Sequence, residues 1–255
     1  MRNTPSFTDT IWAVAKGYMP KVLQARGWVL AGLVALPCAI LLLVQALEGS
    51  YNPKNALEVY HYAYGQIALP ILALLAAPAC ISEDMEQRTL PLMLVRPAPA
   101  WALPLGKGLL WFAWCAVWLV AIVALMPLAG LSAIPQKMLA LVLVFWAQLG
   151  LASMFLLLFK RGTLWAALLF FVWDPMVTVL PPALQRITFM HYLASLSASS
   201  YSKSNAMHIL SQTQITSPVW LAVTVLVAFG LVAWLVCGLR LMRSPIGLAG
   251  REAEG

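Results

Sequence analysis

Long apolar runs with almost no charged residues constrain this chain more than any other feature of its sequence. Each run is about 20 residues long, which is the length of a helix that crosses a bilayer. Because lipid offers no partners to backbone N–H and C=O groups, such runs are expected to be helices. With 62% hydrophobic residues, the chain is predicted to be an all-α polytopic membrane protein. We expect six spans, at residues 28–47, 63–81, 105–127, 138–159, 163–180 and 219–239.

The basic residues predict how these spans are oriented. The chain has 16 Lys and Arg; if the N-terminus is cytoplasmic, twelve fall on the inner side and four on the outer side. The outer four are Lys54, Lys137, Arg186 and Lys203. This bias follows the positive-inside rule, so both termini and the loop 82–104 are expected in the cytoplasm. These flanking positions account for the net charge of +7, and we expect no nucleic-acid partner.

The chain divides into three parts. Residues 1–27 include a stretch, 7–27, in which apolar residues recur at helical spacing and basic residues lie elsewhere on the wheel. This pattern predicts an amphipathic helix in the cytoplasmic interface, bent near Pro20; a disordered basic arm is the alternative. Residues 28–240 hold the spans, and the first span is expected to be an uncleaved anchor. Residues 241–255 are expected to form a cytoplasmic tail.

The sequence carries no recognisable catalytic motif. No phosphate-binding loop is present, and the nearest string, Gly106-Lys107-Gly108, lacks the required first glycine and hydroxyl residue. The four cysteines are widely spaced within expected spans, and the three histidines are scattered on the expected outer side. Neither a disulfide nor a metal site is therefore expected. We do not expect the chain to be an enzyme or to hold a cofactor of its own.

Asp174 is the exceptional ionisable residue within an expected span. A charge at membrane depth is costly and is usually paired or functional. Asp174 either lines a polar cavity or pairs with a cation, or it caps a helix that restarts at Pro175. Both interpretations make the fifth span irregular. Beyond it lies the long, serine-rich outer segment 181–218, whose apolar part 184–196 is expected to form a short helix on or in the outer membrane face.

The loop 82–104 is the stretch most informative about function. It concentrates charge in a chain with only 10% charged residues, through three acids and two arginines: Glu83, Asp84, Glu86, Arg88 and Arg96. Pro91 can begin a short helix over 92–95, and Pro97 and Pro99 end it. A short exposed helix held between two spans by rigid turns can receive a partner and transmit its movement. The loop is thus either a docking surface or a tether.

This loop resembles the cytoplasmic loop in permease subunits of type-2 ATP-binding-cassette (ABC) transporters. In that family an acidic stretch follows the second span; a Thr-Leu pair, a short helix, Arg-Pro and a Gly-Lys that opens the third span come next. The matching positions here are Ser82, Glu83, Glu86, Thr89, Leu90, Leu92, Met93, Leu94, Arg96, Pro97, Gly106 and Lys107. The family also has six spans, an N-terminal elbow helix and a longer outer segment before the last span. Arg88 departs from the pattern, because members often have glycine there.

The resemblance implies a permease subunit of an exporter in a bacterial inner membrane. Two copies, or this chain and a related one, would form the pathway, and separate ATPase subunits would bind ATP and Mg. The loop helix would lie in a cleft of the ATPase, which makes the following residues the candidates for coupling: Glu83, Asp84, Glu86, Arg88, Thr89, Leu90, Leu92, Arg96 and Pro97.

Several roles within this loop stay open on the sequence. Glu83 and Glu86 would contact either the ATPase or the elbow helix. Arg88 would pair with Asp84 or reach the ATPase, whereas for Arg96 and Lys107 the alternative is contact with lipid phosphates only. The chief rival function is a non-transporting scaffold or regulatory subunit of an envelope complex. The tryptophans at 111, 114 and 118 are expected to face lipid or to pack against neighbouring helices, and no substrate is indicated.

Overall fold

A computed structural model describes residues 7–48, 53–80, 102–178, 182–197 and 217–243 of the chain. Within these ranges the secondary structure is helical and no strand occurs, which confirms the all-α fold class. Five helical segments in this part of the chain are long and apolar enough to cross a membrane: Ala25–Glu48, Pro53–Cys80, Pro104–Ala129, Ile134–Leu158 and Val219–Leu241. They correspond to five of the six expected spans.

The remaining expected span, 163–180, is not among these five. Its apolar helix runs over Gly162–Met176 and has fewer than 18 residues. At a rise of 1.5 Å per residue such a helix extends less than about 27 Å, short of a typical hydrocarbon core. It is also irregular, since α9 (Gly162–Leu168) continues as a π-helix over Leu169–Trp173 and a 3₁₀-helix over Asp174–Thr178. The predicted irregularity of this segment is thus observed.

The second span begins ten residues earlier than the sequence predicts, because α3 (Pro53–Glu58) leads without a break into a π-helix and then into α4 (Leu69–Cys80). The π-helix, Val59–Ala68, is held by two tyrosines on its buried side. The hydroxyl of Tyr60 donates to the carbonyl of Lys137 at 3.0 Å, and that of Tyr64 donates to the carbonyl of Val34 at 2.8 Å. These bonds tie the irregular turns to two neighbouring spans.

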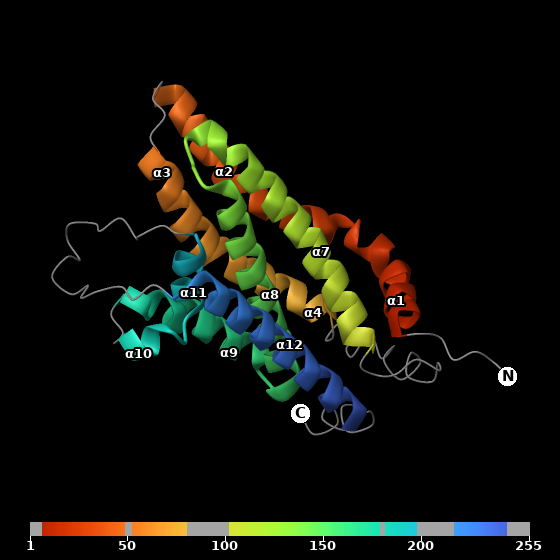
Figure 1. The fold of residues 1–255 in the computed structure, drawn as a ribbon. Helices are drawn as coiled ribbons and strands as arrows, with labels where there is room; N and C mark the ends of the chain where they lie inside the picture. Colours follow the sequence, from red (N-terminus) through yellow and green to blue (C-terminus); the bar gives the residue numbers. More distant parts are fainter. Residues whose placement is uncertain (1–6, 49–52, 81–101, 179–181, 198–216, 244–255) are drawn as a thin grey trace.

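The centre of the bundle is α8 (Ile134–Leu158), which contacts α4, α7 (Ala102–Leu125), α9 and α12 (Val219–Arg243) (Figure 1). Small residues bring α8 and α12 close together. A Cβ on Gly150 would lie 3.3 Å from both the Ala233 Cβ and the Gly230 carbonyl oxygen, and one on Gly230 would lie 2.1 Å from the Trp146 ring nitrogen. Close approach at small residues is a common way for membrane helices to associate without a hydrophobic driving force.

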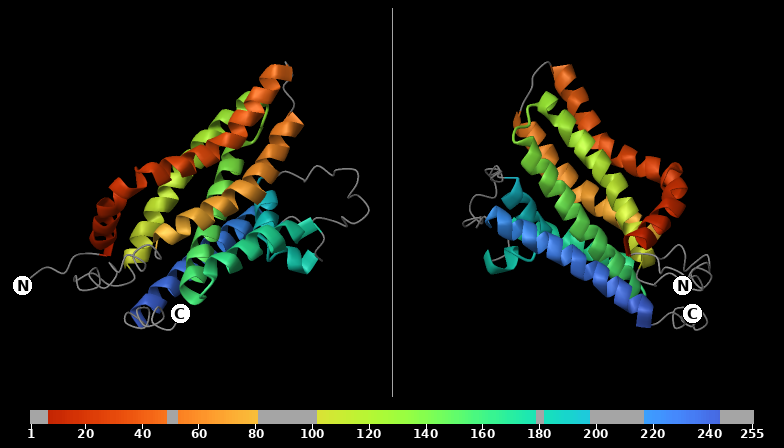
Figure 2. Two further views of the ribbon diagram at one scale, coloured as in Figure 1. Left: turned by 180° about the vertical axis from the view of Figure 1, so that it is seen from behind. Right: turned by 45° about the vertical axis from the view of Figure 1, so that its right-hand side comes forward.

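The N-terminal helix α1 (Phe7–Val22) lies beside α7, and a short turn joins it to α2 (Ala25–Glu48) (Figures 1 and 2). It continues through Pro20, close to its last turn. Ala15 and Val22 are buried, whereas Trp12 is 71% exposed and Met19 is 52% exposed. The helix predicted for this region is therefore present, with one side packed on the bundle and large apolar groups on the other.

After α9 the chain forms two further short helices before it returns through α12. These are α10 (Pro182–Gln185) and α11 (Phe189–Leu196), and they fall in the region where a short helix was expected over 184–196. α11 packs against α8 and α12. His191 is buried in α11, and His61 is buried within the second span, where the sequence interpretation had placed it outside.

Candidate functional site at the loop end of the bundle

The two spans on either side of the loop 82–104 end close together. α4 ends at Cys80, α7 begins at Ala102, and these two helices contact each other. The end of α12 and the turn between α8 and α9 lie at the same end of the bundle, which we call the loop end (Figures 1 and 2). The contacts made there by α1 and α7 define the candidate site.

Two cations from different helices meet on the ring of Tyr18 in α1. Lys107 Nζ, from the first turns of α7, lies 3.8 Å from the ring centroid, and Lys21 Nζ lies 4.9 Å from it. Lys107 is only 1% exposed. An ammonium group over an aromatic face is attracted by the ring quadrupole, and more strongly where water is excluded. Lys107 therefore joins α7 to α1 through Tyr18, an aromatic partner that sequence reasoning did not single out.

Gly106 shows how tightly α1 lies on this part of α7. A Cβ at Gly106 would lie 2.9 Å from Cγ1 of Val14 and 3.2 Å from the carbonyl oxygen of Ile11. Any side chain here would push α1 away from α7. The two residues therefore both contribute to the packing: Gly106 allows α1 to approach α7 closely, and Lys107 contacts Tyr18 of α1.

Arg26 and a group of tryptophans connect the same region to α2 and α4. The Arg26 guanidinium donates to the carbonyl of Leu75 in α4, and its Cζ lies 5.9 Å from the Trp111 ring centroid. Trp114 Nε1 donates to the carbonyl of Gly27 at 3.0 Å and packs edge-on against Trp28 with ring centroids 5.8 Å apart. Trp118 also packs edge-on against Trp28, with ring centroids 6.0 Å apart. These contacts place the three tryptophans of α7 in packing roles, which was one of the two alternatives expected for them.

The coupling residues predicted from the sequence lie outside the described residues, together with the short helix expected among them. They are Glu83, Asp84, Glu86, Arg88, Thr89, Leu90, Leu92, Arg96 and Pro97. The described structure therefore bears on the anchoring of this loop, through Cys80, Ala102 and α1, and leaves the predicted roles of its residues as predictions.

Asp174, the other predicted site residue, caps a helix, but a different one from the helix expected. Its Oδ1 accepts hydrogen bonds from the backbone N–H groups of Phe189 at 2.6 Å and Met190 at 3.2 Å. These groups are the first donors of α11, and Asp174 is 2% exposed. The prediction of a cap for a helix beginning at Pro175 was wrong because the carboxylate bonds to α11 instead, while residues 174–178 form a 3₁₀-helix.

Further polar bonds fasten α11 to the start of α12. Nε2 of His191 and Oγ of Ser217 lie 2.8 Å apart, and Ser195 Oγ accepts from the backbone N–H of Ser217 at 3.1 Å. Burial, and secondarily the positive charge of Arg186, hold the pKa of His191 below its ordinary value of 6.5. This arrangement supports a neutral, structural imidazole. In the described part of the chain no group of three His, Cys, Asp or Glu residues is placed to hold a metal ion.

The described fold is thus that of a multi-pass, all-α membrane protein in which an N-terminal helix is fixed to the start of the third long span. In comparisons with known proteins, no protein-family model and no curated sequence matches this chain.

Proposed function

We propose that this chain is the transmembrane permease subunit of an ABC exporter, which moves substrate across a bacterial inner membrane using ATP hydrolysed by separate ATPase subunits. The observation that carries the proposal is the packing of α1 on Gly106 and Lys107. These two residues close the motif through which loop 82–104 resembles the type-2 family. The family that this loop resembles also has an amphipathic N-terminal elbow helix.

The packing supports a route by which a push on the loop reaches the bundle. The loop joins Cys80 of α4 to Ala102 of α7, and both helices pack on α8, which in turn packs on α12. A partner that displaced the loop would therefore move two helices that share one central neighbour. In the proposal, the residues of the loop contact the ATPase, and α1 keeps the start of α7 in place beneath the membrane surface.

The proposal includes a full topology. The irregular segment that begins with Gly162–Met176 makes the remaining crossing, the fifth in chain order. Both termini and loop 82–104 are cytoplasmic, and α1 lies in the interface. The exposed Trp12 and Met19 on α1 suit such an interfacial position. Two copies, or this chain and a related permease, would enclose the pathway, and each ATPase would carry the ATP and Mg that this chain has no motif to bind.

The experiment is a double charge reversal in the loop, Glu83→Lys with Glu86→Lys, in the complex reconstituted with its ATPase. We expect the permease-dependent part of the ATPase rate to fall at least about tenfold, equivalent to roughly 1.4 kcal/mol of coupling, while the complex still assembles. The matched control is Glu48→Lys with Glu58→Lys, two exposed acids on α2 and α3. An unchanged rate in the loop variant would show that these acids are only anchors.

A further inference from the structure

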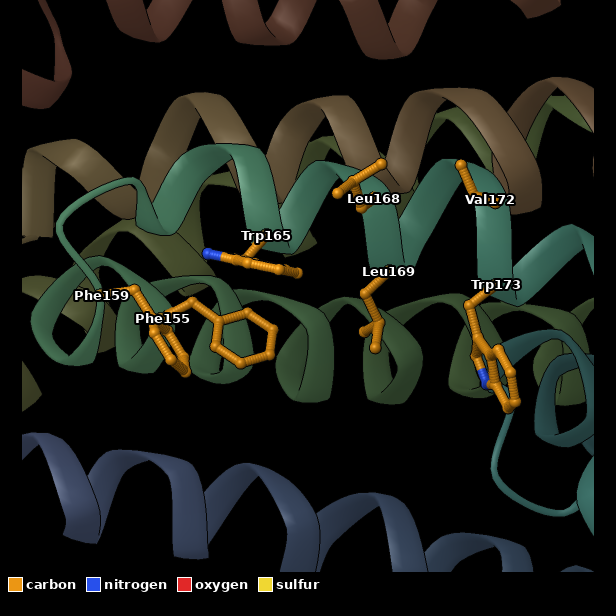
Figure 3. Close-up of a pocket in the computed structure, with 7 residues that line it drawn as sticks. All are labelled: Phe155, Phe159, Trp165, Leu168, Leu169, Val172 and Trp173. Atoms are coloured by element: carbon orange, nitrogen blue, oxygen red, sulfur yellow. The ribbon is translucent and has the colours of Figure 1, made fainter.

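An apolar groove runs along the outside of the bundle between the end of α8 and the helical segment 162–173. It has a volume of about 380 Å³ and is lined only by apolar and aromatic residues: Phe155, Phe159, Trp165, Leu168, Leu169, Val172 and Trp173. Figure 3 shows Trp165 with the two phenylalanines toward one end, Trp173 and Val172 toward the other, and Leu168 and Leu169 between them. The groove is therefore elongated, with an aromatic group at each end.

The start of α9 packs tightly against the α8 backbone beside the groove. A Cβ on Gly162 would lie 2.2 Å from the Phe155 carbonyl oxygen and 2.5 Å from Cα of Leu156, so the glycine lets the start of α9 touch the α8 backbone. The π-helical turns of Leu169–Trp173 then follow. α9 and α12 both pack on α8 and have few contacts with each other, which leaves this side of α9 uncovered.

The lining residues are only partly buried. Trp165 is 52% exposed, Val172 is 48% exposed and Leu168 is 44% exposed. In a membrane-spanning protein, such side chains meet hydrocarbon. An acyl chain is long, narrow and apolar, as the groove is, and it is the hydrocarbon that surrounds every crossing segment.

The turn at one end of the groove carries two positive charges. Lys160 and Arg161 directly follow Phe159, and both are exposed. The Phe159 ring lies 6.2 Å from that of Trp165 and 5.4 Å from that of Phe155, which places the turn at the aromatic end of the groove. The sequence holds no acidic residue between Glu86 and Asp174, so the stretch of chain that contains this turn carries only positive charges.

We propose that this groove is a binding site for an anionic glycerophospholipid, with one acyl chain along the groove and the phosphate at Lys160 and Arg161. The apolar lining and the adjacent pair of cations match the two halves of such a lipid. A second copy of this chain is a poorer occupant, because a contact between copies here would bring two pairs of cations together in chains of net charge +7. The site is independent of the proposed transport function.

The experiment is native mass spectrometry of the full-length protein, delipidated in detergent and titrated with phosphatidylglycerol or phosphatidylcholine of the same acyl chains. We expect one site that prefers phosphatidylglycerol. Lys160→Gln with Arg161→Gln should reduce that preference about 30-fold, or about fivefold for each charge. Lys16→Gln with Lys54→Gln, which removes the same net charge from exposed positions elsewhere, should leave it unchanged.

A second pair of variants tests the acyl half of the site. Val172→Trp should fill the groove and weaken both lipids at this site, whereas Val117→Trp, on an exposed position of α7, should weaken neither. Melting curves of the two Trp variants establish that both fold. Equal phosphatidylglycerol binding by all variants would overturn the proposal. So would a Val172→Trp variant that loses a dimer while its lipid binding is unchanged, since a second copy would then be the occupant.

Discussion

Two short apolar helices between α8 and α12 in the chain, α9 and α11, have opposite surroundings. All eight residues of α11 are buried. In α9 only Gly162 and Ala166 are buried, and Trp165 and Leu168 are largely exposed. Both sequences are apolar, so apolarity alone does not decide whether a short membrane helix is covered by protein or faces lipid.

The difference lies in polar anchoring. The Asp174 carboxylate accepts hydrogen bonds from the first N–H groups of α11, and the Thr188 hydroxyl accepts one from the N–H of His191. A hydrogen bond between His191 and Ser217 joins α11 to the start of α12. α9 is held at its start by the close approach of Gly162 to α8. In a low-dielectric setting these directional bonds specify one position for α11, and their loss is costly because buried donors and acceptors would be left without partners.

The largest expected effect is on the Asp174 cap. Asp174→Ala should lower the free energy of unfolding by about 2–3 kcal/mol, because two buried N–H groups lose their acceptor. Asp174→Asn keeps an acceptor oxygen and should cost about 1 kcal/mol or less. Denaturant titration in detergent, followed by tryptophan fluorescence, measures both. Equal, negligible losses would mean that the cap does not hold α11.

A matched pair of leucines tests the comparison through packing. Leu193 in α11 is 0% exposed and Leu168 in α9 is 44% exposed. Leu193→Ala should cost about 2 kcal/mol through the cavity it leaves, the low end of values for soluble cores, since lipid is as apolar as leucine. Leu168→Ala should change stability by less than about 0.5 kcal/mol. The contrast would be refuted if the two variants melted alike in lipid-free detergent.

The smallest expected effect is a pH dependence from His191. The pKa of His191 is lower in the folded protein than its ordinary value of 6.5. At a pH near or below that value, the folded state therefore binds fewer protons than the unfolded state. Stability should be full above that pH and decline as the pH falls below it, as the imidazole that bonds Ser217 becomes charged. Melting temperatures between about pH 8 and pH 5 measure this decline. His191→Gln, which does not titrate, should flatten it.

Some of this fold was predictable because hydrocarbon length and backbone pairing impose strong local rules. Five spans, the helix before the first of them and a short helix after residue 184 all follow from apolar pattern alone. The π-helix within the second span did not, because it depends on Tyr60 and Tyr64 bonding to carbonyls on other helices. Local patterns carry no information about such partners.

The same limit applies to the candidate sites. Asp174 was recognised as exceptional from its depth, yet its partners lie 15 and 16 residues further along the chain. For Lys107 the sequence left contact with lipid phosphates as one alternative, whereas the structure buries the side chain on Tyr18. The available signal for this packing was Gly106, because a glycine at the start of a span allows a neighbouring helix to approach closely.

The most direct test of the proposed function is to purify the full-length chain from its native membranes in polymer-bounded bilayer discs and to identify what accompanies it. The proposal predicts a stoichiometric ATPase subunit with a phosphate-binding loop, and ATP hydrolysis by the purified complex. Recovery of the intact chain without such a subunit, alone or within an envelope assembly that hydrolyses no ATP, would contradict the proposal and favour a scaffold.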